Sequence, residues 1–320
     1  MELHTKCLGR DEDFSVSFVV LNWNGRAVLE KCLDSILAVD HPLREIVVSD
    51  NGSVDGSIEM MKARYAGRVT VIENGRNYGV PIGRNIGIRH ALQSDVDFLF
   101  CLDNDLTIAP DAISKLIAVL RRDERIAMAG ALIMDMAQPD VISSAGGLVN
   151  WTQNMVKTLG ANQKLTGQFR DIWDVDYAGG GALFVRADYV RKHGAVDEGF
   201  IGYGYEDTDF GMRAKQLGYR VVCCADAKVW HRPHSGIGRY SFKKKYLETR
   251  NAIRFIKRYG DTRAWMKYLL YVNAGFVYAF FSEGLQGNLP GVIGKIRGFI
   301  DGLRNRDDLA LRLLDRQAGE

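Results

Sequence analysis

The chain has 320 residues, of which 47% are hydrophobic and 25% are charged. This composition supports a packed globular core and excludes a chain that is disordered throughout. The length fits one large domain, or one domain with an appendage.

The charge is unevenly distributed, although the net charge is only +3. Residues 232–320 contain 17 Lys and Arg against 8 Asp and Glu, or +9, which leaves 25 against 31, or −6, for residues 1–231. The asymmetry predicts two functional regions. The basic region could meet an anionic membrane, an acidic partner or nucleic acid, or could simply present solvated helix faces.

Residues 1–14 are polar and lack the apolar stretch of a secretory signal, so we expect a cytoplasmic protein. The odd number of cysteines and the absence of a Cys-x-x-Cys pair fit a reduced compartment. The five are Cys7, Cys32, Cys101, Cys223 and Cys224.

Strand-like and helix-like segments alternate over the first 120 residues. Strands are predicted at residues 16–21, 45–49, 69–72 and 97–102, and helices at 28–37, after the turn at 50–53, at 84–92 and at 111–120. This alternation predicts an α/β fold with a mainly parallel, doubly wound sheet.

Polar residues follow each of these strands, at Asn22, Asp50, Asn77 and Asp103. Ligands of doubly wound sheets bind beyond the carboxyl ends of the strands. Four polar turns at one edge therefore predict a binding site there.

The pattern becomes less regular after Ile133, where loops and a short hairpin are expected over residues 135–175. Further helices are predicted at 188–193 and 206–217, strands at 220–224 and 228–230, and only helices from residue 239 onward.

Asp103-Asn104-Asp105 closes the fourth strand with two carboxylates two residues apart. Carboxylates beside a buried strand need a compensating charge, and Mg²⁺ or Mn²⁺ takes such oxygen ligands together with substrate phosphates. The alternative is a turn, because Asp and Asn also cap helices and Ala109-Pro110 can start one.

A set of segments spread over two thirds of the chain resembles the inverting glycosyltransferases of family 2. The matching segments are residues 19–25, 48–56, 77–79, 83–87, 103–105, 179–186, 205–211 and 230–231. The resemblance implies the nucleotide-diphospho-sugar transferase (GT-A) fold over residues 15–238. An N-terminal tail at 1–14 and a helical, basic C-terminal extension at 239–320 would flank it.

The resemblance also assigns the donor side of a site. Asp50 would contact the nucleotide base with Asn22 lining the same pocket, and Asn77 and Arg84 belong to the next signature, where Arg84 approaches the nucleotide or its phosphates. Asp103 would serve the ribose or the metal. A simpler interpretation of Asp50 is a turn, with Ser53 as the N-cap of the next helix.

Asp105 and His231, with Asp103, would hold Mn²⁺ or Mg²⁺ according to the same resemblance. Negative charge grows on the departing nucleoside diphosphate, and a divalent cation stabilises it. The alternative for His231 is a core histidine bonded to the backbone.

An acceptor hydroxyl needs a general base, and the adjacent carboxyls Glu206 and Asp207 are candidates, with Asp207 favoured by the resemblance. Two like charges so close would raise the pKa of one of them. Alternatively, they are first-turn acids favoured by a helix dipole. Gly180, Gly181 and Tyr205 lie in segments on the acceptor side, although the glycines could merely allow a tight backbone path.

We therefore expect transfer of a sugar, with inversion, to a hydroxyl of a glycan or lipid-linked acceptor, in bacterial surface polysaccharide assembly. The resemblance is greatest to rhamnosyl-type members, so dTDP- or UDP-linked sugars are the expected donors. The alternative is a nucleotide-sugar or glycan binding module without catalysis. The chain has no Gly-x-x-x-x-Gly-Lys-Ser/Thr loop, and no Gly-x-Gly-x-x-Gly follows the first strand.

The resemblance weakens after Asn251. Residues 265–281 are apolar but slightly short for a membrane span, which favours a core or interfacial helix. Residues 292–304 alternate isoleucines with Lys295, Arg297 and Arg304, as in a basic amphipathic helix. Peripheral membrane contact is expected from this pattern; packing on the catalytic domain or formation of a homodimer is the alternative.

Overall fold

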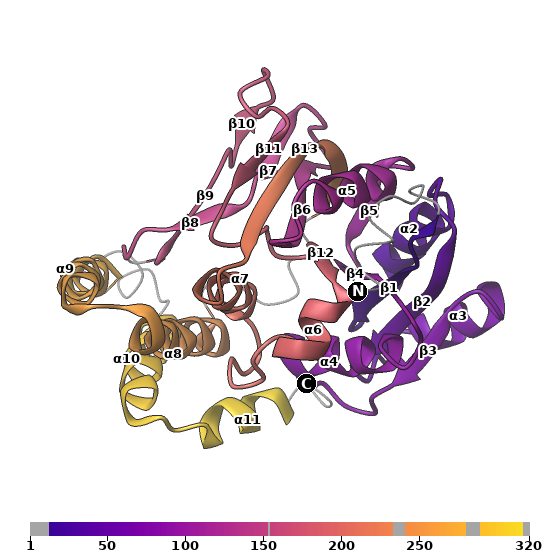
Figure 1. Cartoon of the computed structure of the whole chain (residues 1–320). Helices are drawn as coiled ribbons and strands as arrows, with labels where there is room; N and C mark the ends of the chain where they lie inside the picture. Colours follow the sequence, from indigo (N-terminus) through magenta and orange to yellow (C-terminus); the bar gives the residue numbers. More distant parts are fainter. Residues whose placement is uncertain (1–12, 153, 233–240, 280–288, 316–320) are drawn as a thin grey trace.

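The computed structural model describes residues 13–152, 154–232, 241–279 and 289–315 (Figure 1). Most of the expected N-terminal tail, with Cys7, and the end of the apolar segment at 280–281 lie outside these residues. The elements of the first half alternate as predicted. They are β1 (Val16–Asn22), α2 (Arg26–Leu37), β2 (Leu43–Asp50), α3 (Ser57–Arg64), β3 (Thr70–Glu73), α4 (Val80–Ala91) and β4 (Phe98–Asp103).

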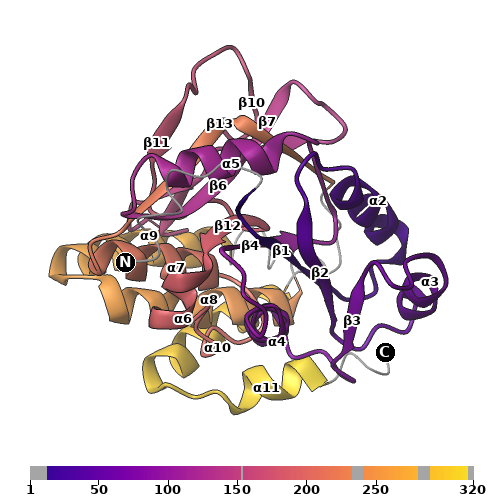
Figure 2. The same ribbon diagram turned by 45° about the vertical axis from the view of Figure 1, so that its right-hand side comes forward.

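The first four strands form a parallel sheet in the order β3-β2-β1-β4 (Figure 2). Alternate residues of β1 face opposite sides, because side chains alternate along a strand. Phe18 packs in a core that includes buried residues of α2, and Val19 packs with Ile88 of α4 on the other face. The helices therefore cover both faces, as in a doubly wound sheet.

The register of this sheet brings polar residues to one edge. Asn22 of β1 lies opposite Asp50 of β2, and Leu21 lies opposite Asp103 of β4. Parallel strands end at the same edge, so Asp50 and Asp103, which lie 28 and 82 positions after their partners Asn22 and Leu21, both become neighbours of the end of β1.

The second half extends the sheet beyond β4 with strands of both directions, which completes a mixed α/β sheet. Strand β12 (Ala182–Arg186) pairs antiparallel with β4 and β6, and β13 (Arg220–His231) runs parallel to β6. The remaining elements are β5 (Leu106–Ile108), α5 (Ala112–Arg121), β6 (Ile126–Asp135), β7 (Val141–Ser144), β8 (Gly147–Val149), β9 (Val156–Thr158), β10 (Gln163–Lys164), β11 (Ile172–Asp174), α6 (Ala187–His193) and α7 (Glu206–Gln216).

Two expectations for this half were wrong in detail. Residues 220–224 and 228–230 belong to one strand, β13, whose register with β6 shifts between Cys224 and Lys228. Strands β6 and β12 were not predicted, because both are buried along almost their whole length and show no alternation. The short hairpin is present as β8 and β9.

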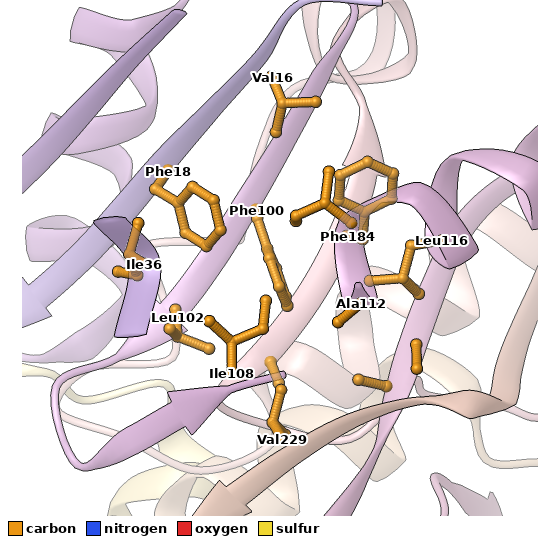
Figure 3. Packing of buried hydrophobic residues seen from close by; sticks show 14 of the residues in the cluster. Val16, Phe18, Ile36, Phe100, Leu102, Ile108, Ala112, Leu116, Phe184 and Val229 are labelled. Carbon is orange, nitrogen blue, oxygen red and sulfur yellow. The ribbon is translucent and has the colours of Figure 1, made fainter. Parts of the chain in front are cut away.

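The aromatic rings of Phe18, Phe100 and Phe184 lie among aliphatic side chains in the core on one side of the central strands (Figure 3). The ring of Phe100 lies 5.1 Å from that of Phe18 and 5.8 Å, edge-on, from that of Phe184. All three side chains are fully buried. Contacts of this kind add to the hydrophobic term, and they join β1, β4 and β12 beneath the polar edge.

The C-terminal helices are α8 (Phe242–Tyr259), α9 (Thr262–Ala279), α10 (Leu289–Arg304) and α11 (Asp308–Asp315). Helix α10 packs on α8 through Gly294, Gly298 and Gly302; a Cβ on Gly294 would lie 2.5 Å from Phe242 O. Glycines thus allow the two helices to approach closely. Within the described ranges, no helix is long and apolar enough to cross a membrane.

Helix α8 also holds the loop that leads into α7. Asn251 is fully buried, and its Nδ2 donates to Ile201 O (3.1 Å) and Tyr203 O (2.8 Å), while its Oδ1 accepts from Arg250 (2.7 Å). Buried carbonyls need partners. One side chain therefore fastens the backbone just before Glu206.

We expect Asn251→Ala to leave these two carbonyls and one Arg250 N–H without their partner. The free energy of unfolding should fall by about 1–3 kcal/mol, the usual cost of unpaired buried polar groups. Urea unfolding measures the change. Val54→Ala, at a side chain that is 85% exposed, is the control and should leave stability nearly unchanged; equal effects of the two substitutions would contradict the role of Asn251.

Candidate functional site

Arg84 of α4 joins two carboxylates that lie far apart in sequence. Its NH1 donates to Asp207 Oδ1 at 2.6 Å, and its NH2 donates to Asp103 Oδ1 at 2.9 Å. The Arg84 side chain is 3% exposed, that of Asp207 17% and that of Asp103 40%. A buried guanidinium requires such counter-charges. The structure thus brings together the expected metal-motif residue, the expected base and the expected phosphate-approaching arginine.

The protonation state of Arg84 follows from these partners. Burial works to lower the pKa of Arg84, but Asp207 and then Asp103 outweigh it and raise the pKa above its ordinary value. Arg84 therefore stays charged and keeps the two carboxylates in place.

Gly180 and Gly181 lie directly against the same two carboxylates. A Cβ on Gly180 would come within 2.8 Å of Asp207 Oδ2, and one on Gly181 within 2.8 Å of Asp103 Oδ2. Gly181 has a φ of +90° and accepts a hydrogen bond from Asp103 N at 2.8 Å. The glycines here permit a close backbone approach, which their simpler interpretation also anticipated.

The two first polar turns form one hydrogen-bonded unit. Asn22 Nδ2 donates to Asp50 Oδ2 (2.7 Å), Ser53 N donates to Asp50 Oδ1 (2.7 Å), and Asn104 Nδ2 donates to Asn22 Oδ1 (2.6 Å). Asn22 and Asp50 are fully buried. Both Asp50 oxygens thus accept bonds from the protein itself. The N-cap of α3 is Gly56, so the prediction of Ser53 as N-cap was wrong.

Asn77 orders the turn before α4. Its Oδ1 accepts from Gly79 N at 2.8 Å and from Asn51 Nδ2 at 3.4 Å. Asn51 in turn donates to Gly79 O at 3.0 Å. These bonds connect the end of β2 to the start of the helix that carries Arg84.

Asp105 and His231 meet because β5 pairs with the end of β13. Asp105 Oδ2 lies 3.2 Å from His231 Nε2, and Asp105 O accepts from Arg232 N at 3.0 Å. Burial acts to lower the pKa of His231, but the bond with Asp105 and the charges of Asp105 and Asp103 raise it. The ring contacts a carboxylate, so the prediction of a histidine bonded to the backbone is not what the structure shows.

The Asp105 carboxylate and the His231 imidazole are both ligand types that Mn²⁺ accepts, so this pair could bind a divalent cation. Among the residues described, no three His, Cys, Asp or Glu are arranged to hold a metal. Mg²⁺ and ions like it commonly take one or two protein ligands and complete their shell with substrate phosphates and water. The donor set therefore fits a cation that arrives with a diphosphate.

Glu206 and Asp207 occupy the first turn of α7, as the helix-dipole interpretation expected. They differ in environment. Glu206 is 6% exposed, and its Oε2 has no hydrogen-bond partner in the described part of the chain, whereas Asp207 is paired with Arg84. Burial, and then the charge of Asp207, raise the pKa of Glu206 to about 8. Near neutral pH, Glu206 is mostly protonated and poorly suited to accept a proton.

A pocket of about 550 Å³ opens beside these two carboxyls. Tyr205, with a φ of +70°, stacks on Phe255 and donates from its hydroxyl to Asn154 O at 3.1 Å. The pocket is lined by parts of four helices, the start of strand β9 and the loops around them. Its lining includes Gly180, Tyr203, Tyr205, Glu206, Asp207, Lys245, Glu248, Thr249, Ala252, Tyr268, Val272 and Lys295.

The contribution of the C-terminal helices to this pocket was missed from sequence. Lys245, Glu248, Thr249 and Ala252 recur at the i, i+3, i+4, i+7 spacing of one helix face. This spacing shows that the four residues share one face of α8, but it does not show which other elements that face contacts.

Residues 17–193 match the family model described as glycosyl transferase family 2. N-acetylglucosaminyl-diphospho-decaprenol L-rhamnosyltransferase of Mycobacterium tuberculosis is 27% identical over 232 residues, covering 66% of this chain and 74% of its own. Low-salt glycan biosynthesis hexosyltransferase Agl10 of Haloferax volcanii is 23% identical over 242 residues, which cover 74% of this chain and 73% of that protein.

Solved structures confirm the GT-A fold. GalNAc-T7, crystallised with UDP, GalNAc and Mn²⁺, has a TM-score of 0.62 and 19% identity, over 95% of this chain and 56% of that one. Mannosyltransferase PcManGT from Pyrobaculum calidifontis, in complex with GDP-Man and Mn²⁺, has a TM-score of 0.55 and 15% identity. The match covers 100% of this chain and 94% of that one.

We expect Glu206 to make the stability of the protein depend on pH. Its pKa of about 8 in the folded protein exceeds its ordinary value of 4.5, so the folded state binds the extra proton between these values. The free energy of unfolding should therefore fall relative to that of Glu206→Gln as the pH rises from about 4.5 to 8. Urea unfolding across this range measures it.

Glu59→Gln, an exposed substitution on α3, controls for the loss of one negative charge. A difference between wild type and Glu206→Gln that does not change with pH would show that the Glu206 carboxyl is ionised throughout.

Proposed function

The chain belongs to glycosyl transferase family 2 and uses a nucleotide-sugar donor; we propose that it transfers the sugar, with inversion, to a hydroxyl of a glycan or lipid-linked acceptor. The named relatives support this acceptor class, since one acts on a diphospho-decaprenol and one in glycan biosynthesis. Assembly of a bacterial surface polysaccharide is the setting that we propose.

The observation that carries the proposal is the ion-paired cluster of Asp103, Arg84 and Asp207. Arg84 places a carboxylate of the donor side and a carboxylate of the acceptor side around one guanidinium. An inverting transfer is a single displacement in which the acceptor oxygen enters opposite the departing diphosphate. It therefore needs acceptor and donor groups close together but distinct, as this cluster provides.

On the acceptor side, we assign the general base to Asp207. It lies at the wall of the pocket, where an acceptor hydroxyl can reach it. Glu206, protonated near neutral pH, can donate a hydrogen bond to the acceptor and so orient it. As the hydroxyl attacks the anomeric carbon, its proton passes to Asp207, and the bond to the diphosphate breaks.

On the donor side, we assign the nucleotide to the turns of Asn22 and Asp50, with a dTDP- or UDP-linked sugar as donor. Both Asp50 oxygens already accept hydrogen bonds from the protein. A nucleobase of the donor would therefore bond to a remaining lone pair of Asp50 or replace one of these protein donors. Asp103, 40% exposed, faces the ribose or diphosphate in this proposal.

We further assign Mn²⁺ or Mg²⁺ to Asp105 and His231, with Asp103 nearby. The cation, when bound, supplies positive charge to the diphosphate as it leaves. GalNAc-T7 and PcManGT were both solved with Mn²⁺, which supports this assignment.

We propose residues 15–238 as the catalytic domain and 239–320 as a helical region that completes the acceptor pocket. Lys245, Tyr268 and Lys295, all from the helical region, line the pocket beside Asp207. This sharing of one pocket supports a role for the helices in acceptor binding.

Asp105→Asn should weaken the binding of UDP or dTDP in the presence of Mn²⁺ and leave binding in chelator unchanged, because it removes a charged ligand of the cation. Calorimetry on the folded variant measures both affinities. Asp111→Asn, at a carboxylate paired with Lys115 on α5, is the matched control and should change neither. Equal weakening with and without metal would assign Asp105 a structural role.

Asp207→Asn should lower kcat by about 10²–10⁴-fold, the usual cost of losing a general base, with nearly unchanged nucleotide affinity. Glu206→Gln keeps a hydrogen-bonding group and should have a milder effect. Turnover is measured with a panel of nucleotide sugars and acceptors, after thermal unfolding has shown that both variants fold. Normal turnover in Asp207→Asn with collapse in Glu206→Gln would transfer the role to Glu206, and no loss in either would overturn the proposal.

A further inference from the structure

Exposed apolar side chains are concentrated on α9 and α10. Thirteen large hydrophobic residues are exposed in the described part of the chain, and nine of them belong to these two helices. The nine are Met266, Leu269, Leu270, Tyr271, Leu289, Ile293, Ile296, Ile300 and Leu303. Scattered exposed apolar residues are ordinary, whereas a concentration of this kind marks an interaction surface.

The five apolar residues of α10 form one continuous row. Their spacing of 4, 3, 4 and 3 residues places them on a single helix face, over a length of about 21 Å at 1.5 Å per residue. Gly294, Gly298 and Gly302 occupy a different face, which packs on α8. Packing on α8 therefore accounts for one face of α10, and the apolar row stays exposed.

Cations border one side of the row. At about 100° per residue, Arg297 and Arg304 lie along this border, whereas Lys295 lies near the glycine face and lines the pocket. The only carboxylate of α10 is Asp301, which is 1% exposed and bonded to Arg297 and Tyr246. An apolar face bordered by cations, without exposed acids, is typical of helices that lie in a lipid interface.

Helix α9 repeats this character. Its exposed residues combine Met266 and Leu270, 61% and 70% exposed, with the exposed cations Arg263 and Lys267. Its other face carries Tyr268 and is buried. Among the described side chains of α9, no carboxylate is present.

Both helices also form the wall of the acceptor pocket. Tyr268 and Val272 of α9 and Lys295 of α10 line it together with Asp207. Helices α8, α9 and α10 lie together at the end of the molecule opposite α3 (Figures 1 and 2). The uncovered faces therefore belong to the same two helices that border the pocket.

We propose that the exposed faces of α9 and α10 dock on an anionic lipid bilayer, so that the acceptor pocket is held at the membrane surface. The apolar row would enter the boundary between headgroups and acyl chains, and the bordering cations would meet anionic headgroups. This inference rests on the proposed function. Docking on the bilayer favours a lipid-linked acceptor over a free glycan, because the sugar of such a lipid would extend from the bilayer into a pocket already positioned there.

Charge favours the bilayer over a second copy of the chain. A two-fold contact sets the same patch against itself, and would bring the cations Arg263, Lys267, Arg297 and Arg304 of the two copies into one interface without an exposed carboxylate on either helix. An anionic lipid surface complements all of these charges at once.

Vesicle co-sedimentation tests the proposal without any activity measurement. The full chain should bind vesicles of equal parts phosphatidylcholine and phosphatidylglycerol, and bind vesicles of phosphatidylcholine alone much more weakly. Ile296→Glu combined with Ile300→Glu should reduce binding to the anionic vesicles by more than about tenfold, because two apolar side chains no longer enter the lipid. Arg263→Gln combined with Arg304→Gln should reduce binding severalfold, and about 0.5 M salt should weaken binding by the wild type.

Leu217→Glu, at an apolar residue 51% exposed after α7, is the matched control and should bind like the wild type. No binding to anionic vesicles, or equal loss with Leu217→Glu, would overturn the proposal. The proposal would also be overturned if the protein bound no lipid and light scattering showed a dimer. In that case Ile296→Glu combined with Ile300→Glu would dissociate the dimer. Donor turnover, measured separately, stays a test of the proposed function, so that either idea can fail without the other.

Discussion

The ion pairing of Arg84 with Asp103 and Asp207 is the constraint on which the site depends. A guanidinium that is 3% exposed cannot be left without counter-charge, and within the described residues Asp103 and Asp207 are the carboxylates that form ion pairs with it. The interaction therefore joins α4, the end of β4 and the start of α7, which belong to different parts of the chain. The glycines at 180 and 181 follow from the same requirement, because a side chain there would collide with the carboxylates.

The C-terminal helices position parts of the site in addition to exposing an apolar surface. Asn251 of α8 fastens the loop before α7, and so fixes the position of Glu206 and Asp207 relative to Arg84. The glycine face of α10 lets that helix approach α8 closely, which brings Lys295 to the pocket wall. Acceptor binding and docking on a lipid surface would thereby be properties of one helical unit.

Particular residues show how far the sequence could be interpreted. The alternation of buried strands and amphipathic helices up to α5 was predicted to within a few residues, apart from the short strand β5, because each of the other strands is a short apolar run that ends in a polar turn. Strands β6 and β12 were missed, since continuous burial removes the alternation that identifies a strand. Asp105 and His231 were paired only through a family resemblance, and the structure brings them together through the pairing of β5 with β13.

The sequence by itself determined the α/β class, the order of the elements and the set of polar residues at the strand ends, because these depend on local periodicity and on residue type. Only the tertiary structure decided which of those residues meet. Arg84 pairs with carboxylates 19 and 123 positions away, and no local pattern in the sequence identifies these partners. Glu206 and Asp207 are adjacent and chemically alike in sequence, but burial raises the pKa of the first and an arginine pairs with the second. Long-range contact and desolvation depend on the packing of distant segments, and no local pattern records them.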